Sequence, residues 1–335
     1  MVRYDCGIDT GGHDIGLSNT DNLTVSYNQC YGGGTETGID GITLNYCDVG
    51  VIEYNRIYDH IKSDGTQFGE DAIDTKGSSN IHIRYNVIYG NRAGGIKVNN
   101  SDAMKANSSN IHIYHNRIYG NGTNIVVSDV DENVYIWSNV IYGSTGGHGI
   151  CCTQTGSNIH IYNNTLINNH GADGDKWAIV LTTGSDYYIK NNIFYSDTHN
   201  DLISKGSAAT NVNLDYNHYC YTGGAAIVSW NGAKGTLTKL KAFGQEANGQ
   251  EGDPLFTNVG GHDYTLQVGS PCKDTGTDSL KAIYADGLDP GETEWSTTPC
   301  TIKTTNQGVY GSWEKGAYIY TGSQLLKPPQ YLKLK

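Results

Sequence analysis

Apolar and polar residues alternate in short segments along most of this chain, and the segments repeat. Eight of them align without gaps: NLTVSYNQCY, VGVIEYNRIY, NIHIRYNVIY, NIHIYHNRIY, NVYIWSNVIY, NIHIYNNTLI, DYYIKNNIFY and NVNLDYNHYC. One column is Asn in every segment: Asn28, Asn55, Asn86, Asn116, Asn139, Asn164, Asn192 and Asn217. Successive members lie 27, 31, 30, 23, 25, 28 and 25 residues apart, which is the length of one coil of a solenoid.

Apolar residues occupy fixed positions around each Asn. Three residues before it stand Val25, Ile52, Ile83, Ile113, Ile136, Ile161, Ile189 and Leu214. Two residues after it stand Cys30, Ile57, Ile88, Ile118, Ile141, Leu166, Phe194 and Tyr219. A third strand is expected about thirteen residues before the Asn, with its inward positions at Ile42, Ile73, Val126 and Ile179. Three short strands per coil predict an all-β fold, a right-handed parallel β-helix.

We interpret the Asn column as structural rather than catalytic. Asn tolerates the left-handed backbone of a tight turn, and stacked amides can form hydrogen bonds from coil to coil. A sandwich would instead need antiparallel hairpin turns of Asn-Gly or Asp-Gly type, which are scarce between these strands.

The repeat fades after about residue 225. We therefore expect a β-helix catalytic domain over residues 1–225 and a C-terminal capping segment of the same domain over residues 226–335. The stretch GTLTKLKAFGQEANGQEGDPLF predicts one short helix, followed by irregular strands and loops. Such a segment would close the open end of the solenoid or lie along its side.

The composition narrows the range of functions. The 335-residue chain contains 44 Gly, 25 Tyr and only 17% charged residues, a composition that is not typical of a helical protein. Its formal net charge of −12 argues against nucleic-acid binding, and an acidic ligand would need a local positive site. No apolar run is long enough to span a membrane, and the first residues carry no secretory signal. We expect a secreted monomer from which the targeting segment has been removed.

The 8 cysteines do not follow a zinc-binding spacing. Cys30 occupies a core position of the repeat, which suits a small apolar side chain. Cys272 and Cys300 could pair in an oxidising compartment, and their spacing leaves this open.

Aligning the coils gathers acidic residues from different parts of the sequence. GIDGIT (38–43), EDAIDT (70–75) and GGIKV (94–98) fall on successive turns of one strand, about 4.8 Å apart. This alignment predicts an exposed cluster of Asp40, Glu70, Asp71 and Asp74, with Lys97 beside Asp74. Several carboxylates from neighbouring coils suit Ca²⁺, which prefers oxygen ligands. The alternative is a solvated turn with an ordinary salt bridge between Lys97 and Asp74.

This arrangement resembles the calcium-dependent polysaccharide lyases of family 9, which are pectate and rhamnogalacturonan lyases. The resemblance implies that Asp40, Glu70, Asp71 and Asp74 bind Ca²⁺ and that Lys97 is the Brønsted base. It departs at Glu70, where the family usually has Asp. The fold-level likeness covers roughly residues 1–225, whereas the site rests on a few positions.

The resemblance implies a secreted lyase that cleaves an acidic polysaccharide by Ca²⁺-assisted β-elimination. Pectate or rhamnogalacturonan is the expected substrate, and alginate carries the same kind of uronate. Lys76, Arg92, Lys105 and Lys176 are expected near the site, where they would bind further uronates of the polymer.

Three alternatives remain at this point. EDAIDTKGSSNIHIRYN is also similar to family 1 pectate lyases, whose arginine base two coils on has no counterpart in NGTNIVVSD. NTD (19–21) and GGHGI (146–150) are similar to elements of the polygalacturonases, but Asp71 and His148 lie 77 residues apart, which favours a loop histidine. The third is a non-catalytic β-helix module, a carbohydrate-binding protein or adhesin that uses Ca²⁺ for stability.

Overall fold

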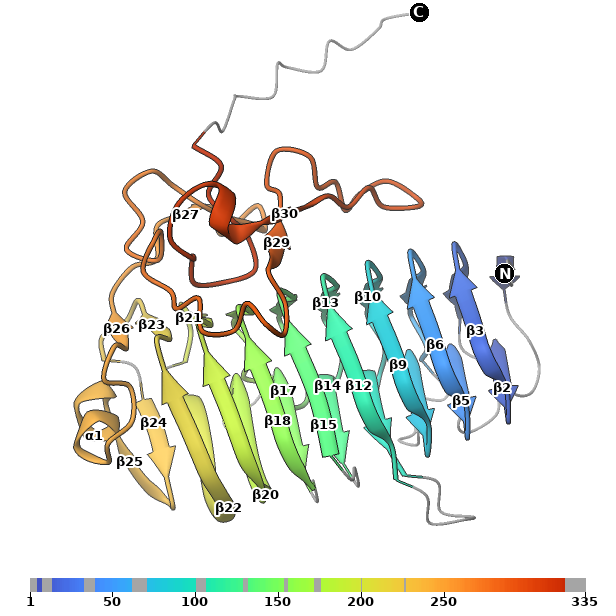
Figure 1. Ribbon diagram of the computed structural model, residues 1–335, viewed down its shortest axis with the longest axis horizontal. Helices are drawn as coiled ribbons and strands as arrows, with labels where there is room; N and C mark the ends of the chain where they lie inside the picture. Colours follow the sequence, from blue (N-terminus) through green and yellow to red (C-terminus); the bar gives the residue numbers. More distant parts are fainter. Residues whose placement is uncertain are drawn as a thin grey trace, which may run out of the picture.

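The strands wind into coils that stack along the long axis of the molecule, from the N-terminal to the C-terminal end (Figure 1). Neighbouring coils pair in parallel and in register along all three faces, so the predicted parallel β-helix is confirmed. The computed structural model describes residues 5–7, 14–32, 40–61, 71–100, 107–128, 132–153, 156–171, 176–199, 201–225 and 227–322.

Each coil contributes one strand to each of three faces. The first face contains β2 (Ile15–Ser18), β5 (Ile42–Asn45), β8 (Ile73–Lys76), β11 (Gly94–Asn99), β14 (Thr123–Ser128), β17 (Ile150–Thr153) and β24 (Ile227–Trp230). The second face contains β3 (Asp21–Ser26), β6 (Asp48–Glu53), β9 (Ser79–Arg84), β12 (Ser109–Tyr114), β15 (Glu132–Trp137) and β18 (Ser157–Tyr162). The long strands β20 (Ile179–Lys190) and β22 (Asp201–Asp215) run through both of these faces.

The third face is a separate sheet of short strands. It contains β1 (Asp5–Gly7), β4 (Gln29–Tyr31), β7 (Arg56–Tyr58), β10 (Val87–Tyr89), β13 (Arg117–Tyr119), β16 (Val140–Tyr142), β19 (Thr165–Ile167), β21 (Ile193–Ser196), β23 (His218–Tyr221) and β26 (Gln250–Glu251). Because side chains alternate across a strand, each face sends one set inward and one set outward.

The inward positions form continuous apolar columns. Both columns predicted around the Asn are buried along their whole length, from Val25 to Leu214 and from Cys30 to Tyr219. The first face adds Ile15, Ile42, Ile73, Ile96, Ile125, Ile150, Ile179 and Ile203. The prediction was wrong at Val126, which pairs with Lys97 and faces outward, whereas Ile125 faces the core. The two apolar neighbours look alike in sequence, and only the strand register separates them.

The Asn column forms the predicted ladder. The backbone N–H of each member donates to the side-chain oxygen of the next member at 2.9–3.0 Å. The side-chain amides donate to the same oxygens at 2.8–3.1 Å. The ladder ends on a buried carboxylate, Glu246, which accepts from the Asn217 amide at 2.6 Å and from the Tyr219 hydroxyl at 2.7 Å.

The left-handed turn residue is not the ladder Asn, as the sequence interpretation assumed, but the residue before it. These residues are Tyr27, Tyr54, Tyr85, His115, Ser138, Asn163, Asn191 and Tyr216, with φ between 49° and 61°. The positive φ turns the chain and lets the side-chain amide of the following Asn point into the coil. The first residue of each pair therefore makes the turn, and the Asn after it makes the hydrogen bonds.

A second polar ladder follows at the turn after the third face, which the sequence interpretation missed. The Asn91 side-chain oxygen accepts from the His60 backbone N–H, and that of Asn121 accepts from Asn91. Asn124 and Asn169 continue the chain of amides. A repeated YGN five residues after the first ladder is the sequence signal for it.

The outward aromatic residues stack on one another from coil to coil. Tyr31, Tyr58, Tyr89, Tyr119 and Tyr142 form one stack, with ring centroids 4.6–5.2 Å apart. Tyr27, Tyr54 and Tyr85 form another. Coil packing therefore accounts for these eight of the 25 tyrosines.

The C-terminal segment first covers the end of the solenoid and then turns back along its side (Figure 1). The predicted short helix is confirmed as α1 (Leu237–Ala242), whose Leu237 and Leu240 join the main core. The chain continues through β25 (Ala233–Gly235) before the helix, and after it through β27 (Phe256–Asn258), β28 (Asp263–Leu266), β29 (Asp286–Leu288), β30 (Thr304–Asn306) and a 3₁₀ turn at Gln307–Val309.

Apolar side chains of this segment pack on the outer surface of the coils. Phe256, Leu288 and Trp295 pack over the third face, and Leu280, Tyr284 and Trp313 pack over the second. Cys272 and Cys300 are both buried free thiols, so they do not form the disulfide that the sequence left open. No helix in the described ranges has the length and apolar character needed to cross a membrane.

Candidate metal centre and groove

Three aspartates from two neighbouring coils meet where the first face begins. Asp40 precedes β5, while Asp71 and Asp74 lie at the start of the next coil, before and within β8. One carboxylate oxygen from each lies within 4.8 Å of the other two. The register of the first face brings them together, because Thr43 pairs with Asp74 and Asp74 pairs with Lys97. This places Lys97 beside Asp74, as predicted.

Backbone and hydroxyl donors fix two of these carboxylates. The Asp71 N–H donates to Asp40 Oδ1 at 3.0 Å, and the Thr43 hydroxyl donates to Asp40 Oδ2 at 3.1 Å. The Gly94 N–H donates to Asp71 Oδ1 at 2.6 Å. A Cβ at Gly94 would lie 2.5 Å from that same oxygen. Glycine is therefore required there for the backbone to approach the carboxylate.

The cluster is buried, which corrects the expectation of an exposed patch. Asp40 and Asp71 are each 3% exposed and Asp74 is 1% exposed. The side chains of Lys76 and Lys97 lie against these carboxylates, and long lysine side chains can cover what lies beneath them. Asp74 Oδ1 is buried and has no hydrogen-bond partner among the described residues. An unsatisfied buried carboxylate oxygen is costly unless a cation or another donor meets it.

Burial and crowding change the acidity of the cluster. Burial raises the pKa of Asp74 to about 7, and the neighbouring carboxylates of Asp71 and Asp40 add to this effect. Burial also raises the pKa of Asp71, although Lys97 opposes the change. A cation among the three oxygens would favour the ionised forms of both groups.

Two lysines neutralise part of the cluster. Lys97 Nζ lies 3.4 Å from Asp71 Oδ2, while Lys76 Nζ lies 3.3 Å from Asp40 Oδ2 and 3.1 Å from Asp74 Oδ2. Burial tends to lower the pKa of each lysine, but the carboxylates outweigh it and raise both. Lys76 was expected to contact substrate, yet here its ammonium bridges two carboxylates. Its sequence position, two residues after Asp74 on one strand, places both side chains on the same face.

An open groove of about 490 Å³ begins at Asp71 and Lys97. Arg92 and Thr123 also line it, and glycines from neighbouring coils, including Gly94 and Gly147, form much of the rest. Arg92, predicted as a substrate-binding residue, therefore shares one groove with Lys97. Asp71 is the one carboxylate that the described residues contribute to this groove.

The remaining predicted residues stand apart from this groove or cannot be placed. Glu70 and Lys105 lie outside the described residues. Lys176 donates its backbone N–H to the His170 carbonyl and packs against Gly171, which neighbours Gly146 at the far end of the groove.

The polygalacturonase-like elements do not assemble around the acidic cluster. Asp21 starts β3 on the second face, whereas the three aspartates belong to the first. His148 Nδ1 accepts the backbone N–H of Trp177 at 2.9 Å, which suits the loop histidine that was expected. The position two coils after Asp74, where family 1 pectate lyases carry arginine, is Val126.

Comparison with known proteins identifies the class to which this fold belongs. Residues 2–194 match the family described as the right-handed β-helix region. The match covers more than half of the chain, which therefore belongs to this family, and the predicted hand of the solenoid is confirmed.

No curated protein matches the sequence significantly. Among solved structures, the chain is similar to the tailspike protein gp49 from Pseudomonas phage LKA1, with 12% sequence identity and a TM-score of 0.32. The likeness covers 64% of this chain and 45% of the tailspike chain, so this chain spans less than half of that protein's length.

Proposed function

We propose that this protein is a Ca²⁺-dependent polysaccharide lyase that cleaves a uronate polymer, pectate or rhamnogalacturonan, by β-elimination. The observation that carries the proposal is the buried trio Asp40, Asp71 and Asp74 with the orphaned Asp74 oxygen, next to Lys97 at the mouth of a groove. The resemblance to the family 9 lyases supports the same assignment of residues.

The donor set fits a calcium ion. Asp40, Asp71 and Asp74 each offer a carboxylate oxygen, the ligand type that Ca²⁺ prefers over the nitrogen and sulfur ligands of zinc. The buried, unpartnered oxygen of Asp74 and its raised pKa are what a carboxylate positioned for a cation would show in its absence. Glu70 stays a proposed fourth ligand on the strength of the resemblance alone.

Ca²⁺, when bound, would neutralise the substrate carboxylate and make the proton on the adjacent C5 more acidic. Lys97 is the proposed base, since its amine reaches both the cluster and the groove. Its Nζ takes the C5 proton, the C4–C5 double bond forms, and the bond from C4 to the glycosidic oxygen breaks. The leaving oxygen takes a proton from solvent, and the product is an unsaturated uronate.

The ionisation of Lys97 sets the pH at which this chemistry runs. A base must be neutral, but Asp71 and Asp74 raise the pKa of Lys97 despite its burial. Positive charge bound by the carboxylates would oppose that shift. Turnover is therefore expected to need alkaline pH. It should fall steeply when no cation neutralises the carboxylates. Arg92, in the same groove, would pair with a further carboxylate of the polymer.

The test is a product screen on polygalacturonate, rhamnogalacturonan and alginate, with Ca²⁺ or with chelator. We expect ultraviolet-absorbing unsaturated products from a pectic polymer, with Ca²⁺ only. Lys97→Ala should abolish their formation, whereas Lys234→Ala, at an exposed lysine paired with Asp201, should leave it unchanged. Activity retained in Lys97→Ala would move the base elsewhere, and unchanged activity in chelator would remove Ca²⁺ from the mechanism.

The alternatives give different products or none. A hydrolase would release saturated sugars, and a two-carboxylate mechanism would need a second acid that the described residues do not supply to this groove. A non-catalytic module would cleave none of the three polymers, yet would lose thermal stability on chelation. The proposal does not survive either result.

A further inference from the structure

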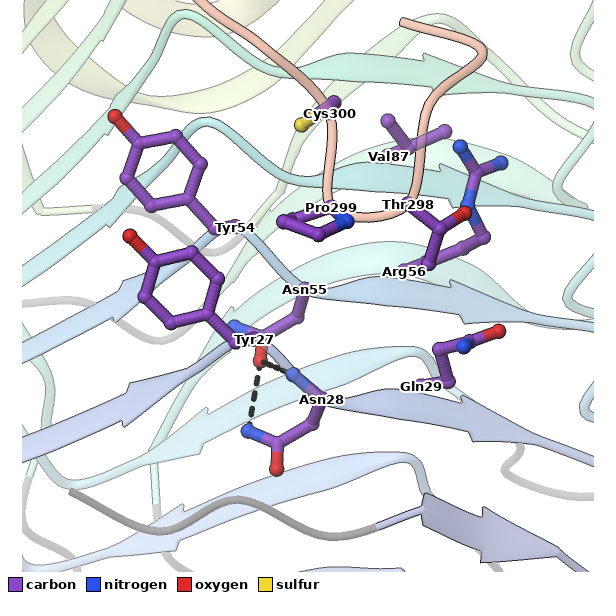
Figure 2. Close-up of a pocket in the computed structure, with 10 residues that line it drawn as sticks. All are labelled: Tyr27, Asn28, Gln29, Tyr54, Asn55, Arg56, Val87, Thr298, Pro299 and Cys300. Atoms are coloured by element: carbon purple, nitrogen blue, oxygen red, sulfur yellow. Dashed lines mark hydrogen bonds between the residues drawn. The ribbon is translucent and has the colours of Figure 1, made fainter.

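A second pocket lies at the turn between the second and third faces, in the first coils of the solenoid (Figure 2). Its volume is about 350 Å³. Gln29 of β4 and Arg56 of β7 lie on one side of it, and the rings of Tyr27 and Tyr54 lie on the other. The loop Thr298–Cys300 from the C-terminal segment passes over it. It shares no lining residue with the groove beside Lys97.

The overlying loop is held in place by contacts between distant parts of the sequence. Arg56 Nη2 donates to the carbonyls of Trp295 at 2.8 Å and Thr297 at 3.0 Å. The Cys300 thiol donates to the Tyr85 carbonyl at 3.2 Å. The pocket is therefore preformed, and its shape does not depend on a ligand closing it.

One side of the pocket offers an aromatic surface. Tyr27 and Tyr54 stack with centroids 5.2 Å apart and planes 3° from parallel. Tyr27 is 39% exposed, and no other ring from the described ranges stacks on it. A ring that ends a stack in this way presents apolar surface, on which the C–H groups of a sugar ring pack well.

The opposite side offers planar polar groups. Arg56 has five N–H donors, and both of its hydrogen bonds in the described structure come from Nη2. Its other donors make no hydrogen bond in the described structure, and a guanidinium suits a carboxylate better than an ammonium does. Gln29, the register neighbour of Arg56, adds an amide that donates and accepts. An aromatic surface, a cation and an amide around one pocket match a sugar that carries a carboxylate.

We propose that this pocket binds a single uronate unit of an acidic polysaccharide, as a site separate from the groove beside Lys97. The choice of a uronate rests on the proposed function, whereas the pocket and its chemistry do not. Such a site would hold a polymer to the first coils while another part of it occupies the groove.

Calorimetry with digalacturonate tests this proposal. The titrations use Lys97→Ala in the presence of chelator, so that the disaccharide stays intact and no metal contributes to binding. We expect Tyr27→Ala, added to this background, to weaken binding about tenfold through loss of the aromatic contact. Gln29→Ala should weaken it less, since it removes one uncharged partner. The matched control is Tyr31→Ala, a 37% exposed tyrosine of the same coil that stacks on Tyr58 outside the pocket.

A second titration tests the need for the carboxylate. The neutral disaccharide of the same linkage, galactobiose, should bind about tenfold more weakly than digalacturonate because Arg56 loses its partner. Equal binding of the two sugars, equal effects of Tyr27→Ala and Tyr31→Ala, or no binding at all would overturn the proposal. If the protein forms unsaturated products but binds no digalacturonate in this pocket, the lyase assignment stands and only the pocket proposal fails. If digalacturonate binds in this pocket but no product forms from any polymer, only the lyase assignment fails.

Discussion

Lys76 occupies the position that a cation would have to share, so replacing it should tighten Ca²⁺ binding. Its ammonium lies 3.3 Å from Asp40 Oδ2 and 3.1 Å from Asp74 Oδ2, and its side chain is 29% exposed. A calcium ion bound by these two carboxylates meets this positive charge, and the lysine has to move toward solvent. The side chain is exposed enough to do so, at the expense of both ion pairs.

The size of the effect follows from these two pairs. Each partly exposed ion pair contributes about 1 kcal/mol, so the lysine opposes Ca²⁺ by about 2 kcal/mol. In Lys76→Met this opposition is gone, and the Kd for Ca²⁺ should fall about thirtyfold. Without metal, the variant should melt at a lower temperature than the parent, because two buried carboxylates lose their counter-ion. Saturating Ca²⁺ should remove most of that difference.

Calorimetric titration of Ca²⁺ into chelator-treated protein measures the affinity, and thermal melts with and without Ca²⁺ measure the stability. Lys234→Met is the control, since it removes the same charge from an ion pair with Asp201. Its Kd for Ca²⁺ should match that of the parent. If Lys76→Met bound Ca²⁺ no more tightly than Lys234→Met, the ion would not be sharing Asp40 and Asp74 with the lysine. The reasoning about the cluster would then be wrong.

Three further changes probe the ladder, its end and the site. Asn139→Ala should destabilise the fold by about 4 kcal/mol in denaturant melts, because several buried groups that it pairs lose their partner. Burial raises the pKa of Glu246 from 4.5 to about 7, so its contribution to stability is full below pH 4.5 and is lost as pH rises to about 7. Glu246→Gln should remove a pH dependence of at most about 3 kcal/mol across that range. Gly94→Ala should weaken Ca²⁺ binding at least tenfold by displacing Asp71, whereas Gly146→Ala, where an added Cβ meets nothing within 4 Å, should not.

The solenoid was predictable because each coil repeats the same pattern of buried apolar residues and hydrogen-bonded Asn. The Asn ladder and the two buried columns around it each follow one rule of spacing, and eight coils supply the same signal. Where a coil departs from the average length, the prediction slipped, as at Val126, which lies one position from the true inward residue Ile125. A shift of a single residue reverses the facing of a strand. The second ladder at Asn91 and Asn121 was missed because its spacing is regular only in part of the chain.

The sequence predicts which residues come together in the candidate site, but not how deeply they are buried or which side chains they pair with. Register alone places Asp74 beside Lys97 and Asp40 one coil away from Asp71. Burial depends on which long side chains lie over the carboxylates, and strand spacing carries no information about that. The pairing of Lys76 with two aspartates could not be predicted for the same reason. Strand register places the backbone of the lysine, whereas the charges around it decide where its flexible side chain lies.

The charges of the site explain why an acidic protein could bind an acidic polymer through a cation. Asp40, Asp71 and Asp74 together with Lys76 and Lys97 carry a net charge of −1 when all five are ionised. On a chain whose formal net charge is −12, that cluster would repel a uronate. A bound divalent cation would reverse the sign of the cluster, and Arg92 in the adjoining groove would add to it. Substrate binding in this groove should therefore depend on Ca²⁺ even in Lys97→Ala, where no turnover follows.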